Sequence, residues 1–370
     1  MNKYKLLTPG PLTTTETVKR EMLFDHCTWD DDYKNITQSI RSRLLQLAHV
    51  TPERYTSVLM QGSGTFGVES VLSSTVGNTD KLLICSNGAY GSRMAEICEW
   101  NRIPYVHYQE PCDRIPSAEK AARFLDGDSA ITHIAMVHCE TTTGILNDAR
   151  SMGALAHERG KTFILDAMSS FGGMEIPVAD WNIDFLISSA NKCIQGVPGF
   201  SFILANREKL DESKGKGRNL SLNLYDQWEA MERDGKWRFT SPTHTVLAFS
   251  KALDELEAEG GISARSRRYT LNNRLLIDEM ETLDIHPFLG SEHQSPIITT
   301  FLYPQWANFR FPEFYQYIKD RGYVIYPGKL TEVDTFRIGN IGEIYPQDIE
   351  KLTEIIRSFS KEHGGPQNGN

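Results

Sequence analysis

An acid and an amine follow two short apolar runs in the middle of the chain. Asp166 comes directly after residues 163–165, and Lys192 lies in the polar segment that follows residues 185–187. Each run predicts a buried strand of a parallel sheet that ends in a loop at its carboxyl end. Ligands of open α/β sheets bind at that edge, so we expect Asp166 and Lys192 to face one crevice. Their separation suits a single strand-to-strand crossover.

An aspartate and a lysine placed in this way suit the chemistry of pyridoxal phosphate. The lysine can form a Schiff base with the aldehyde of the cofactor, and the aspartate can pair with the protonated pyridine nitrogen. That pairing keeps the ring cationic, so the ring can accept electrons from a substrate carbon. The same two residues also fit a structural ion pair, or an acid and a base on unrelated loops, and the pair alone leaves these interpretations open.

A glycine-rich turn earlier in the chain offers a place for a phosphate. Residues 61–65, Gln-Gly-Ser-Gly-Thr, join a predicted strand at 55–60 to a predicted helix. The backbone N–H groups and the dipole of a helix N-terminus favour an anion, and Ser63 and Thr65 add hydroxyl donors. The turn lacks the third glycine of a dinucleotide fingerprint and the lysine of a Walker loop. A cofactor phosphate that is not part of a nucleotide fits it better.

Two further loops follow predicted strands and carry side chains suited to a ligand. Tyr90 comes after a strand at 81–85, where its ring could stack on a flat cofactor, although a core or surface tyrosine fits the position as well. Thr141 begins a threonine run after a strand at 131–138. That run offers hydroxyl groups to a ligand, and its alternative is an ordinary turn with local capping.

Apolar runs alternate with helical spacings over most of the chain, which predicts an α/β fold with a large domain around a mostly parallel sheet. Residues 211–245 break this alternation. From about residue 285 the chain predicts a smaller α+β unit. We therefore expect four parts: an N-terminal segment near the active site (1–15), a large cofactor-binding domain (16–260), a small C-terminal domain (261–362) and a disordered tail (363–370).

Composition excludes several classes of function. Of the 370 residues, 39 are Lys or Arg and 48 are Asp or Glu, and the net charge of −9 argues against non-specific binding of nucleic acid. No apolar run approaches the ~20 residues that span a bilayer, and no signal peptide is visible. The six cysteines form no CxxC pair and indicate reduced thiols. We expect a cytoplasmic protein without a metal, because no HExxH or Cys/His cluster is present.

Taken together and in order, these motifs resemble the class V branch of the fold type I pyridoxal-phosphate aminotransferases. The likeness covers nearly the whole chain, and the joint order and spacing of the motifs are more specific than any one of them. The stretches that carry it are residues 7–13, 27–30 with Tyr33, 61–65, 87–91, 138–144, 166–170, 188–199, 239–243 and 337–339.

The resemblance implies how the cofactor is held. Lys192 would form the Schiff base and Asp166 would pair with the pyridine nitrogen. The phosphate would lie in a cradle made by Ser63, Gly64 and Thr65.

The resemblance also assigns four residues outside that cradle. Tyr90 would stack on the ring, although relatives often carry Trp there, and Thr141 would contact the side of the ring that bears the hydroxyl group. Thr240 would reach the phosphate of the partner subunit's cofactor, since the family builds each site across a homodimer interface. Arg337 would bind the acidic group of the substrate, because an arginine fork suits both carboxylate and phosphonate oxygens.

Within that branch the chain looks most like enzymes that move the amino group of 2-aminoethylphosphonate to pyruvate. The implied products are phosphonoacetaldehyde and L-alanine, a reaction of phosphonate degradation. Alanine–glyoxylate or serine–pyruvate transamination is the alternative within the family, and it would use almost the same residues. A cofactor-free interaction protein is an alternative from another class, disfavoured because Lys192, Asp166 and Arg337 are all present.

Overall fold

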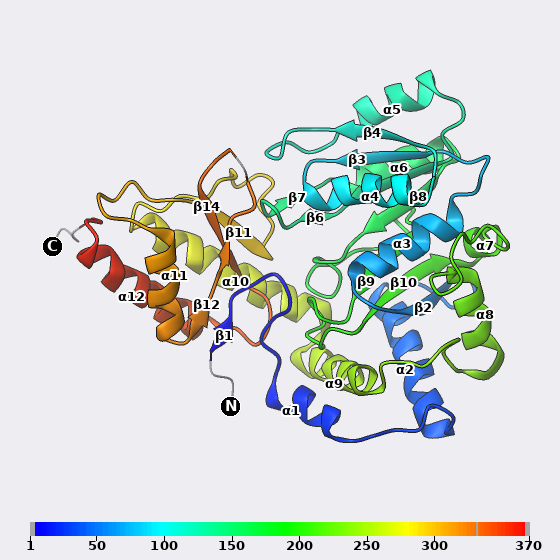
Figure 1. Ribbon diagram of the computed structural model, residues 1–370, viewed down its shortest axis with the longest axis horizontal. Coiled ribbons are helices and arrows are strands. Elements are labelled where there is room, and N and C mark those ends of the chain that lie inside the picture. Colours follow the sequence, from blue (N-terminus) through cyan, green and yellow to red (C-terminus); the bar gives the residue numbers. More distant parts are fainter. Residues whose placement is uncertain (1–3, 331, 367–370) are drawn as a thin grey trace.

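The computed structural model describes residues 4–330 and 332–366. They form a large domain around a seven-stranded sheet and a smaller domain around a three-stranded sheet, which lie to the right and left in Figure 1. Each domain has its own apolar core. None of the described helices is both long enough and apolar enough to cross a membrane. The α/β fold predicted from the sequence is confirmed, whereas the limits 16–260 and 261–362 stay a prediction.

The central sheet is almost entirely parallel. Only one strand, β10, runs against its two neighbours. In spatial order the strands are β2 (Tyr55–Gln61), β10 (Phe200–Asn206), β9 (Phe185–Ser189), β8 (Thr162–Asp166), β5 (His133–Val137), β3 (Leu82–Ser86) and β4 (Tyr105–Gln109). The three strands at the middle of this order, β9, β8 and β5, are fully buried runs of mainly apolar residues, as expected for strands covered on both faces.

Helices cover the sheet and connect its strands. They are α1 (Glu16–Arg20), the 3₁₀ turn η1 (Glu21–Leu23), α2 (Asp31–Leu47), α3 (Gly64–Thr75), α4 (Ala89–Trp100), α5 (Ala118–Gly127), α6 (Ala149–Glu158), α7 (Arg207–Asp211), α8 (Leu224–Asp234) and α9 (Thr243–Glu259). A small hairpin of β6 (Cys139–Glu140) and β7 (Ile145–Leu146) follows β5.

Helix α8 lies within residues 211–245, the segment that breaks the alternation of apolar runs and helical spacings, and it was not predicted from the sequence. The Asn223 side chain accepts a hydrogen bond from the Asp226 N–H (3.1 Å) at its start, and Gly235 closes it in a left-handed conformation (φ 80°). Leu224 and Met231 turn one face into the core of the large domain. The helical spacing is short and flanked by polar residues, so it did not stand out in the sequence.

The smaller domain is built on the long helix α10 (Gly261–Glu281). Its sheet has the antiparallel order β11 (Ile298–Leu302), β14 (Thr335–Gly339), β13 (Tyr326–Pro327). Two helices, α11 (Phe311–Asp320) and α12 (Pro346–Glu362), and the short strand β12 (Tyr323–Val324) complete it. This arrangement places Arg337 on the middle strand of the three.

The N-terminal segment belongs to the small domain by its hydrogen bonds. Strand β1 (Lys5–Leu6) pairs in parallel with β12, and the Gly339 N–H donates to the Leu7 carbonyl (2.9 Å). From there the chain crosses toward the large domain, as the blue segment in Figure 1 shows. At the other end, the His363 ring stacks on Phe359 (3.7 Å between centroids). Residues 367–370 of the predicted tail lie outside the described residues.

Candidate active site

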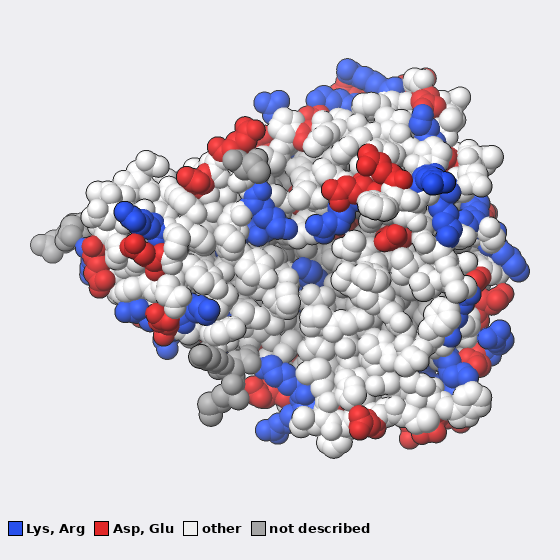
Figure 2. All heavy atoms as spheres, viewed as in Figure 1, with Lys and Arg blue, Asp and Glu red and all other residues white. Residues whose placement is uncertain are grey.

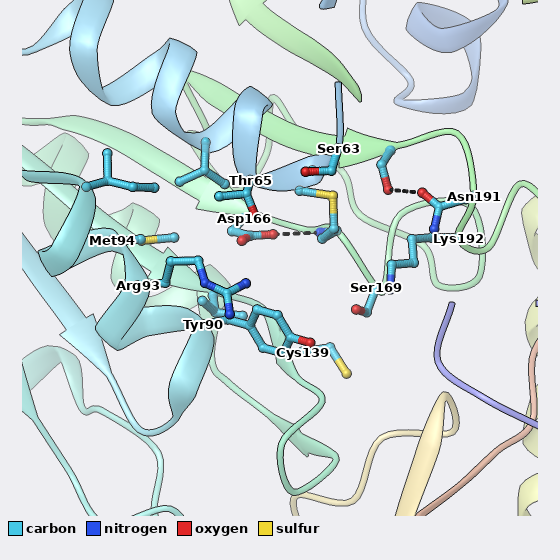
Figure 3. A pocket seen from close by; sticks show the side chains of 16 residues that line it. Ser63, Thr65, Tyr90, Arg93, Met94, Cys139, Asp166, Ser169, Asn191 and Lys192 are labelled. Atoms are coloured by element: carbon cyan, nitrogen blue, oxygen red, sulfur yellow. Dashed lines mark hydrogen bonds between the residues drawn. The ribbon is translucent and has the colours of Figure 1, made fainter. Parts of the chain in front are cut away.

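A cavity opens at the carboxyl ends of the central strands, where the sequence predicts a ligand. Figure 3 shows Ser63 and Thr65 entering it from the start of α3, Tyr90 and Arg93 from α4, Asp166 from the end of β8 and Lys192 from the loop after β9. The structure therefore brings together the acid and the amine on which the sequence interpretation was built. The predicted residues that line the cavity are Ser63, Gly64, Thr65, Tyr90, Asp166 and Lys192.

The Lys192 amine is held by a carbonyl from the distant N-terminal segment. Its Nζ donates a hydrogen bond to the Pro9 carbonyl (2.8 Å). Burial lowers the pKa of Lys192, while Tyr90, Cys193 and Asp166 oppose the shift. Gly10 passes directly over the lysine with φ +123°, and a Cβ there would lie 2.6–2.9 Å from three of its side-chain atoms. Only glycine lets the segment come this close.

Asp166 is a buried carboxylate without an ion-pair partner among the described residues. Its Oδ1 accepts a hydrogen bond from the Met168 N–H (2.9 Å), drawn as a dashed line in Figure 3. Burial raises the pKa of Asp166 to about 6, against the Met168 hydrogen bond, which lowers it; the charge of Glu140 raises it further. A cation placed next to this carboxylate would favour its ionised form.

The N-terminus of α3 faces the same cavity and is free of side-chain capping. Ser63 occupies the N-cap position with an extended backbone, but its hydroxyl makes no capping hydrogen bond. A Cβ on Gly64 would lie 2.3 Å from the Met168 sulfur, so a larger residue there would require the Met168 side chain to move. The arrangement leaves backbone N–H groups and hydroxyls directed at a site suited to an anion.

Tyr90 joins the cavity to a group of cations. The Lys329 Nζ lies 3.3 Å from the Tyr90 hydroxyl. Burial works to raise the pKa of Tyr90, but the charges of Lys192 and Lys329 and hydrogen bonds from Thr141 and Lys329 outweigh it, so the pKa lies below its ordinary value. Thr141 thus lies against Tyr90, behind the cavity wall, and its own side chain is buried.

Arg337 extends from β14 to the loop that carries Thr141, and it is not among the residues that line the cavity. It is 3% exposed, its Nε donates to the Pro327 carbonyl (3.1 Å) and its Nη1 donates to the Thr141 carbonyl (3.0 Å). No carboxylate of the described residues pairs with it. Figure 2 shows Lys and Arg atoms around the hollow at the centre of this face. A buried guanidinium fixed by two carbonyls, with its remaining N–H groups uncommitted, suits an anionic ligand.

Thr240, like Thr141 and Arg337, is a predicted site residue that does not line the cavity. It is exposed, and its carbonyl accepts a hydrogen bond from the Gln61 side chain. Gln61 directly precedes the turn at Gly62, so Thr240 lies near the outer side of the phosphate cradle. Its predicted role, contact with the partner subunit's cofactor, is not tested within one chain and stays a prediction.

The structure adds functional candidates that sequence reasoning missed. Arg93 lines the cavity, and its guanidinium carbon is 5.1 Å from the centroid of the Tyr90 ring. Its position three residues after Tyr90 on a helix was the available signal, because such residues share a face. Glu140 is fully buried and accepts hydrogen bonds from the Tyr90 N–H (3.0 Å) and the Thr142 hydroxyl. It ties the start of α4 to the loop that carries Thr141.

These features fit pyridoxal phosphate. An uncapped helix N-terminus with a glycine at its first position suits the phosphate, and a buried aspartate without a cationic partner suits a protonated pyridine nitrogen. A lysine with a lowered pKa suits an aldehyde. All three open onto one cavity, which a structural ion pair between Asp166 and Lys192 would not need.

Comparison with known proteins agrees with this geometry. The sequence model of the family described as "Aminotransferase class-V" matches residues 36–318. A 2-aminoethylphosphonate–pyruvate transaminase of Lysinibacillus sphaericus is 58% identical over 97% of this chain and 98% of its own length. A bifunctional phosphonoacetaldehyde hydrolase/aminoethylphosphonate transaminase of Clostridioides difficile is 54% identical over 97% of this chain, which spans 56% of that protein. Among solved structures, ureidoglycine–glyoxylate aminotransferase of Bacillus subtilis matches with a TM-score of 0.88 at 20% identity, covering 99% of this chain and 95% of that one.

Proposed function

The chain belongs to the class V aminotransferases, and on that premise we propose that it binds pyridoxal phosphate and moves the amino group of 2-aminoethylphosphonate to pyruvate. The products are phosphonoacetaldehyde and L-alanine. The observation that carries the proposal is a cavity with a half-buried lysine and a buried aspartate, in a chain 58% identical to a transaminase of that name. The name of the bifunctional relative pairs the same amino transfer with a hydrolase of phosphonoacetaldehyde, the product proposed here.

When bound, pyridoxal phosphate supplies an aldehyde that accepts the amino group and a ring that draws electrons from the reacting carbon. Ser63, Gly64 and Thr65 would hold its phosphate, and Asp166 would keep its ring nitrogen protonated. Tyr90 would support one face of the ring. These roles are supported by the cavity lining and by the burial of Asp166.

Lys192 has two tasks in this proposal. Its lowered pKa increases the fraction of neutral amine, which is the nucleophilic form and the basic form. As a base, the Lys192 Nζ would remove a proton from the amine-bearing carbon of the substrate. The Pro9 carbonyl, 2.8 Å from Nζ, orients the amine while it is free.

Arg337 would bind the acidic group of each substrate. The donor has no α-carboxylate, so its only anion is the phosphonate at the far end of a two-carbon chain. The acceptor presents a carboxylate to the same site, because the two half-reactions use one cofactor in turn. The Arg337 fork can give parallel hydrogen bonds to either anion. Its existing bonds to the Pro327 and Thr141 carbonyls fix its plane before the substrate arrives.

A comparison of amino donors tests the proposed function. The cofactor-loaded protein is incubated with pyruvate and with 2-aminoethylphosphonate, serine, alanine or taurine, and the loss of each donor is followed by mass spectrometry. We expect 2-aminoethylphosphonate to be consumed fastest, with phosphonoacetaldehyde and L-alanine formed in equal amounts. Faster consumption of serine, or of alanine with glyoxylate as acceptor, would favour the other reactions of the family.

We also propose that the active unit is a homodimer. A group of exposed apolar side chains, the apolar face, lies on the large domain and consists of Leu23, Phe24, Trp29, Phe66 and Phe239. Its segments are neighbours, because Lys236 lies 3.8 Å from the centroid of the Trp29 ring and Gln61 bonds to Thr240. Large exposed apolar patches mark interaction sites, and this one adjoins the outer side of the phosphate cradle.

Sedimentation distinguishes this face from other exposed apolar residues. Trp29→Glu should shift the protein toward a monomer, because it places a charge in the middle of the proposed interface. Trp100→Glu is the matched control, since Trp100 is even more exposed (88% against 70%) but lies at the end of α4. Mixing inactive Lys192→Ala subunits with inactive Thr240→Ala subunits should restore part of the activity if sites are shared. A fully active monomer would refute the dimer.

The cytoplasm is the proposed location. The six cysteines are free thiols, and several are buried without a partner cysteine. Such thiols are usual in a reducing compartment. Cell fractionation of the native host, followed by assay of the donor reaction, tests this assignment.

A further inference from the structure

Lys329 and Arg337 come from neighbouring segments of the small domain, and both lie close to Tyr90, which lines the cavity. Arg337 lies on β14, opposite Tyr326 of β13, and Lys329 follows β13 by two residues. The Lys329 Nζ is 3.3 Å from the Tyr90 hydroxyl and 4.8 Å from the centroid of its ring. Lys329 has no ion-pair partner among the described residues. Its charge therefore lies beside Tyr90, a residue of the cavity wall, and is not neutralised by a carboxylate of the described residues.

The two cations differ in how they are held. Arg337 is buried and fixed by two carbonyls, so its fork has one orientation. Lys329 is exposed, and it contacts the hydroxyl and the ring of Tyr90. Several surface lysines of the large domain, by contrast, are paired with carboxylates, such as Lys81 with Asp128 (2.6 Å). The Lys329 side chain can therefore change its orientation to contact a ligand that binds beside Tyr90.

The two substrates differ in the negative charge of their acidic groups. The carboxylate of a keto acid carries one negative charge, whereas a phosphonate, like a phosphate monoester, carries up to two near neutral pH. The single positive charge of Arg337 can balance one of the two negative charges of the phosphonate. We propose that Lys329 balances the second, so that it makes the site prefer the dianionic phosphonate donor to carboxylate donors. This inference rests on the proposed function and assigns Lys329 as a residue that determines substrate specificity.

Binding of unreactive anions to the cofactor-loaded protein tests the inference without turnover. The anions are compared at a pH above the second pKa of ethylphosphonate, where it carries two charges, its monomethyl ester carries one on a similar shape, and propionate carries one on a carboxylate. Calorimetry gives their dissociation constants for the wild type, Lys329→Gln and Lys319→Gln. Lys319 is the matched control, because it is a lysine of the same domain that also lies over a tyrosine ring, that of Tyr315 (5.8 Å to the centroid), but Tyr315, unlike Tyr90, does not line the cavity.

We expect Lys329→Gln to weaken ethylphosphonate by about tenfold or more, and to change the monoester and propionate by less than about threefold. Lys319→Gln should leave all three constants unchanged, and Lys329→Arg should restore most of the loss. In kinetics, kcat/KM for 2-aminoethylphosphonate should fall in Lys329→Gln while kcat/KM for pyruvate is retained. An equal loss for all three anions, or an equal effect of Lys319→Gln, would overturn the inference.

The failure of this inference can be told from the failure of the proposed function. If the wild type does not use 2-aminoethylphosphonate at all, the proposed function is wrong whatever the variants do. If the wild type uses it and Lys329→Gln keeps its affinity for ethylphosphonate, only the role of Lys329 is wrong.

Discussion

The charged side chains at the two edges of the central sheet face different surroundings. At the amino ends of the strands, buried or half-buried charges have partners: Asp184 accepts from the Phe163 N–H (2.9 Å), the Lys161 amine donates to the Ile131 carbonyl (2.6 Å), and Arg41 pairs with Glu232. At the carboxyl ends, Asp166 and Lys192 also bond to the backbone, through the Met168 N–H and the Pro9 carbonyl, but together with Arg93 they open onto one cavity, and none of the three has an ion pair among the described residues. Unbalanced charge is costly inside a protein.

We infer that the charges at the amino edge serve stability and that those at the carboxyl edge serve ligand binding. The amino edge directs its hydrogen bonds to the chain itself. The carboxyl edge keeps an acid, an amine and guanidinium groups ready for a ligand that carries both an anion and a cation. Substitutions matched across the two edges can therefore separate activity from stability.

The largest effect should come from matched lysines. Lys192→Ala should lower kcat/KM for amino transfer by about four orders of magnitude or more, because both the nucleophile and the base are lost. Lys161→Ala, at the amino edge, should leave turnover unchanged and lower the free energy of unfolding by about 1 kcal/mol through the lost bond to Ile131. Steady-state kinetics and urea unfolding measure the two. Comparable loss of turnover in both variants would contradict the different roles of the two edges.

Matched arginines should give the next largest effect. Arg337→Lys should lower kcat/KM for both substrates by about a hundredfold, since a point charge cannot form two parallel hydrogen bonds. Arg41→Lys should instead lower the free energy of unfolding by about 1–3 kcal/mol, because Arg41 bonds to the Ser57 carbonyl and the Thr56 hydroxyl. Kinetics with each substrate varied in turn tests the first, and unfolding tests the second. A loss confined to one substrate would contradict a shared anion site.

Asp166 and Asp184, one at each edge, should give the protein two different pH dependences. Burial raises the pKa of Asp166 and of Asp184 to about 6. A cationic ring pairs with the ionised form of Asp166, so cofactor affinity should fall by up to about tenfold per pH unit below pH 6. Asp166→Asn should weaken binding and flatten this part of the profile, whereas Asp184→Asn should keep the wild-type profile. Quenching of tryptophan fluorescence by added cofactor measures the affinity.

Asp184 should act on stability instead. Its folded-state pKa lies above the unfolded value of 3.8, so the folded protein binds the proton more tightly and loses stability as pH rises from about 4 to about 6. Asp184→Asn should reduce that loss. Urea unfolding at several pH values measures it, and an unchanged pH dependence would show that Asp184 is not responsible.

The smallest effect should come from cysteines. Burial raises the pKa of Cys139 to about 12, and its thiol donates to the Ser295 hydroxyl (3.3 Å), so the cavity contains a thiol and not a nucleophilic thiolate. Cys139→Ala should change kcat/KM by less than about threefold, as should Cys98→Ala in the core. A large loss of activity in folded Cys139→Ala alone would give this thiol a role in the reaction.

The sequence was sufficient for features that local patterns carry. Asp166 and Lys192 each follow a buried strand, and the parallel sheet then brings their loops to one edge, so their meeting could be predicted. Ser63 and Tyr90 follow strands in the same way. The loop threonine Thr141 was predicted on weaker grounds, and the structure places it behind Tyr90 and not on the cavity surface.

Features that depend on distant segments could not be predicted in this way. The Pro9 carbonyl that holds Lys192 is 183 residues away in the chain, and no local signal links the two. Lys329 reaches Tyr90 only because the small domain packs beside the cavity mouth. The antiparallel direction of β10 depends on its neighbours, since its residues would suit a parallel strand equally well. The role predicted for Thr240 involves a second subunit, so one chain leaves it a prediction.

Borohydride trapping tests the central claim, that Lys192 at the carboxyl edge carries the cofactor and is displaced from it by the donor amine. The protein is loaded with pyridoxal phosphate, reduced with borohydride, digested and mapped by mass spectrometry. We predict one pyridoxyl phosphate per chain, on Lys192, lost when 2-aminoethylphosphonate is added before reduction and restored when pyruvate follows. Label on another lysine, or label on Lys192 that 2-aminoethylphosphonate does not remove, would contradict the account.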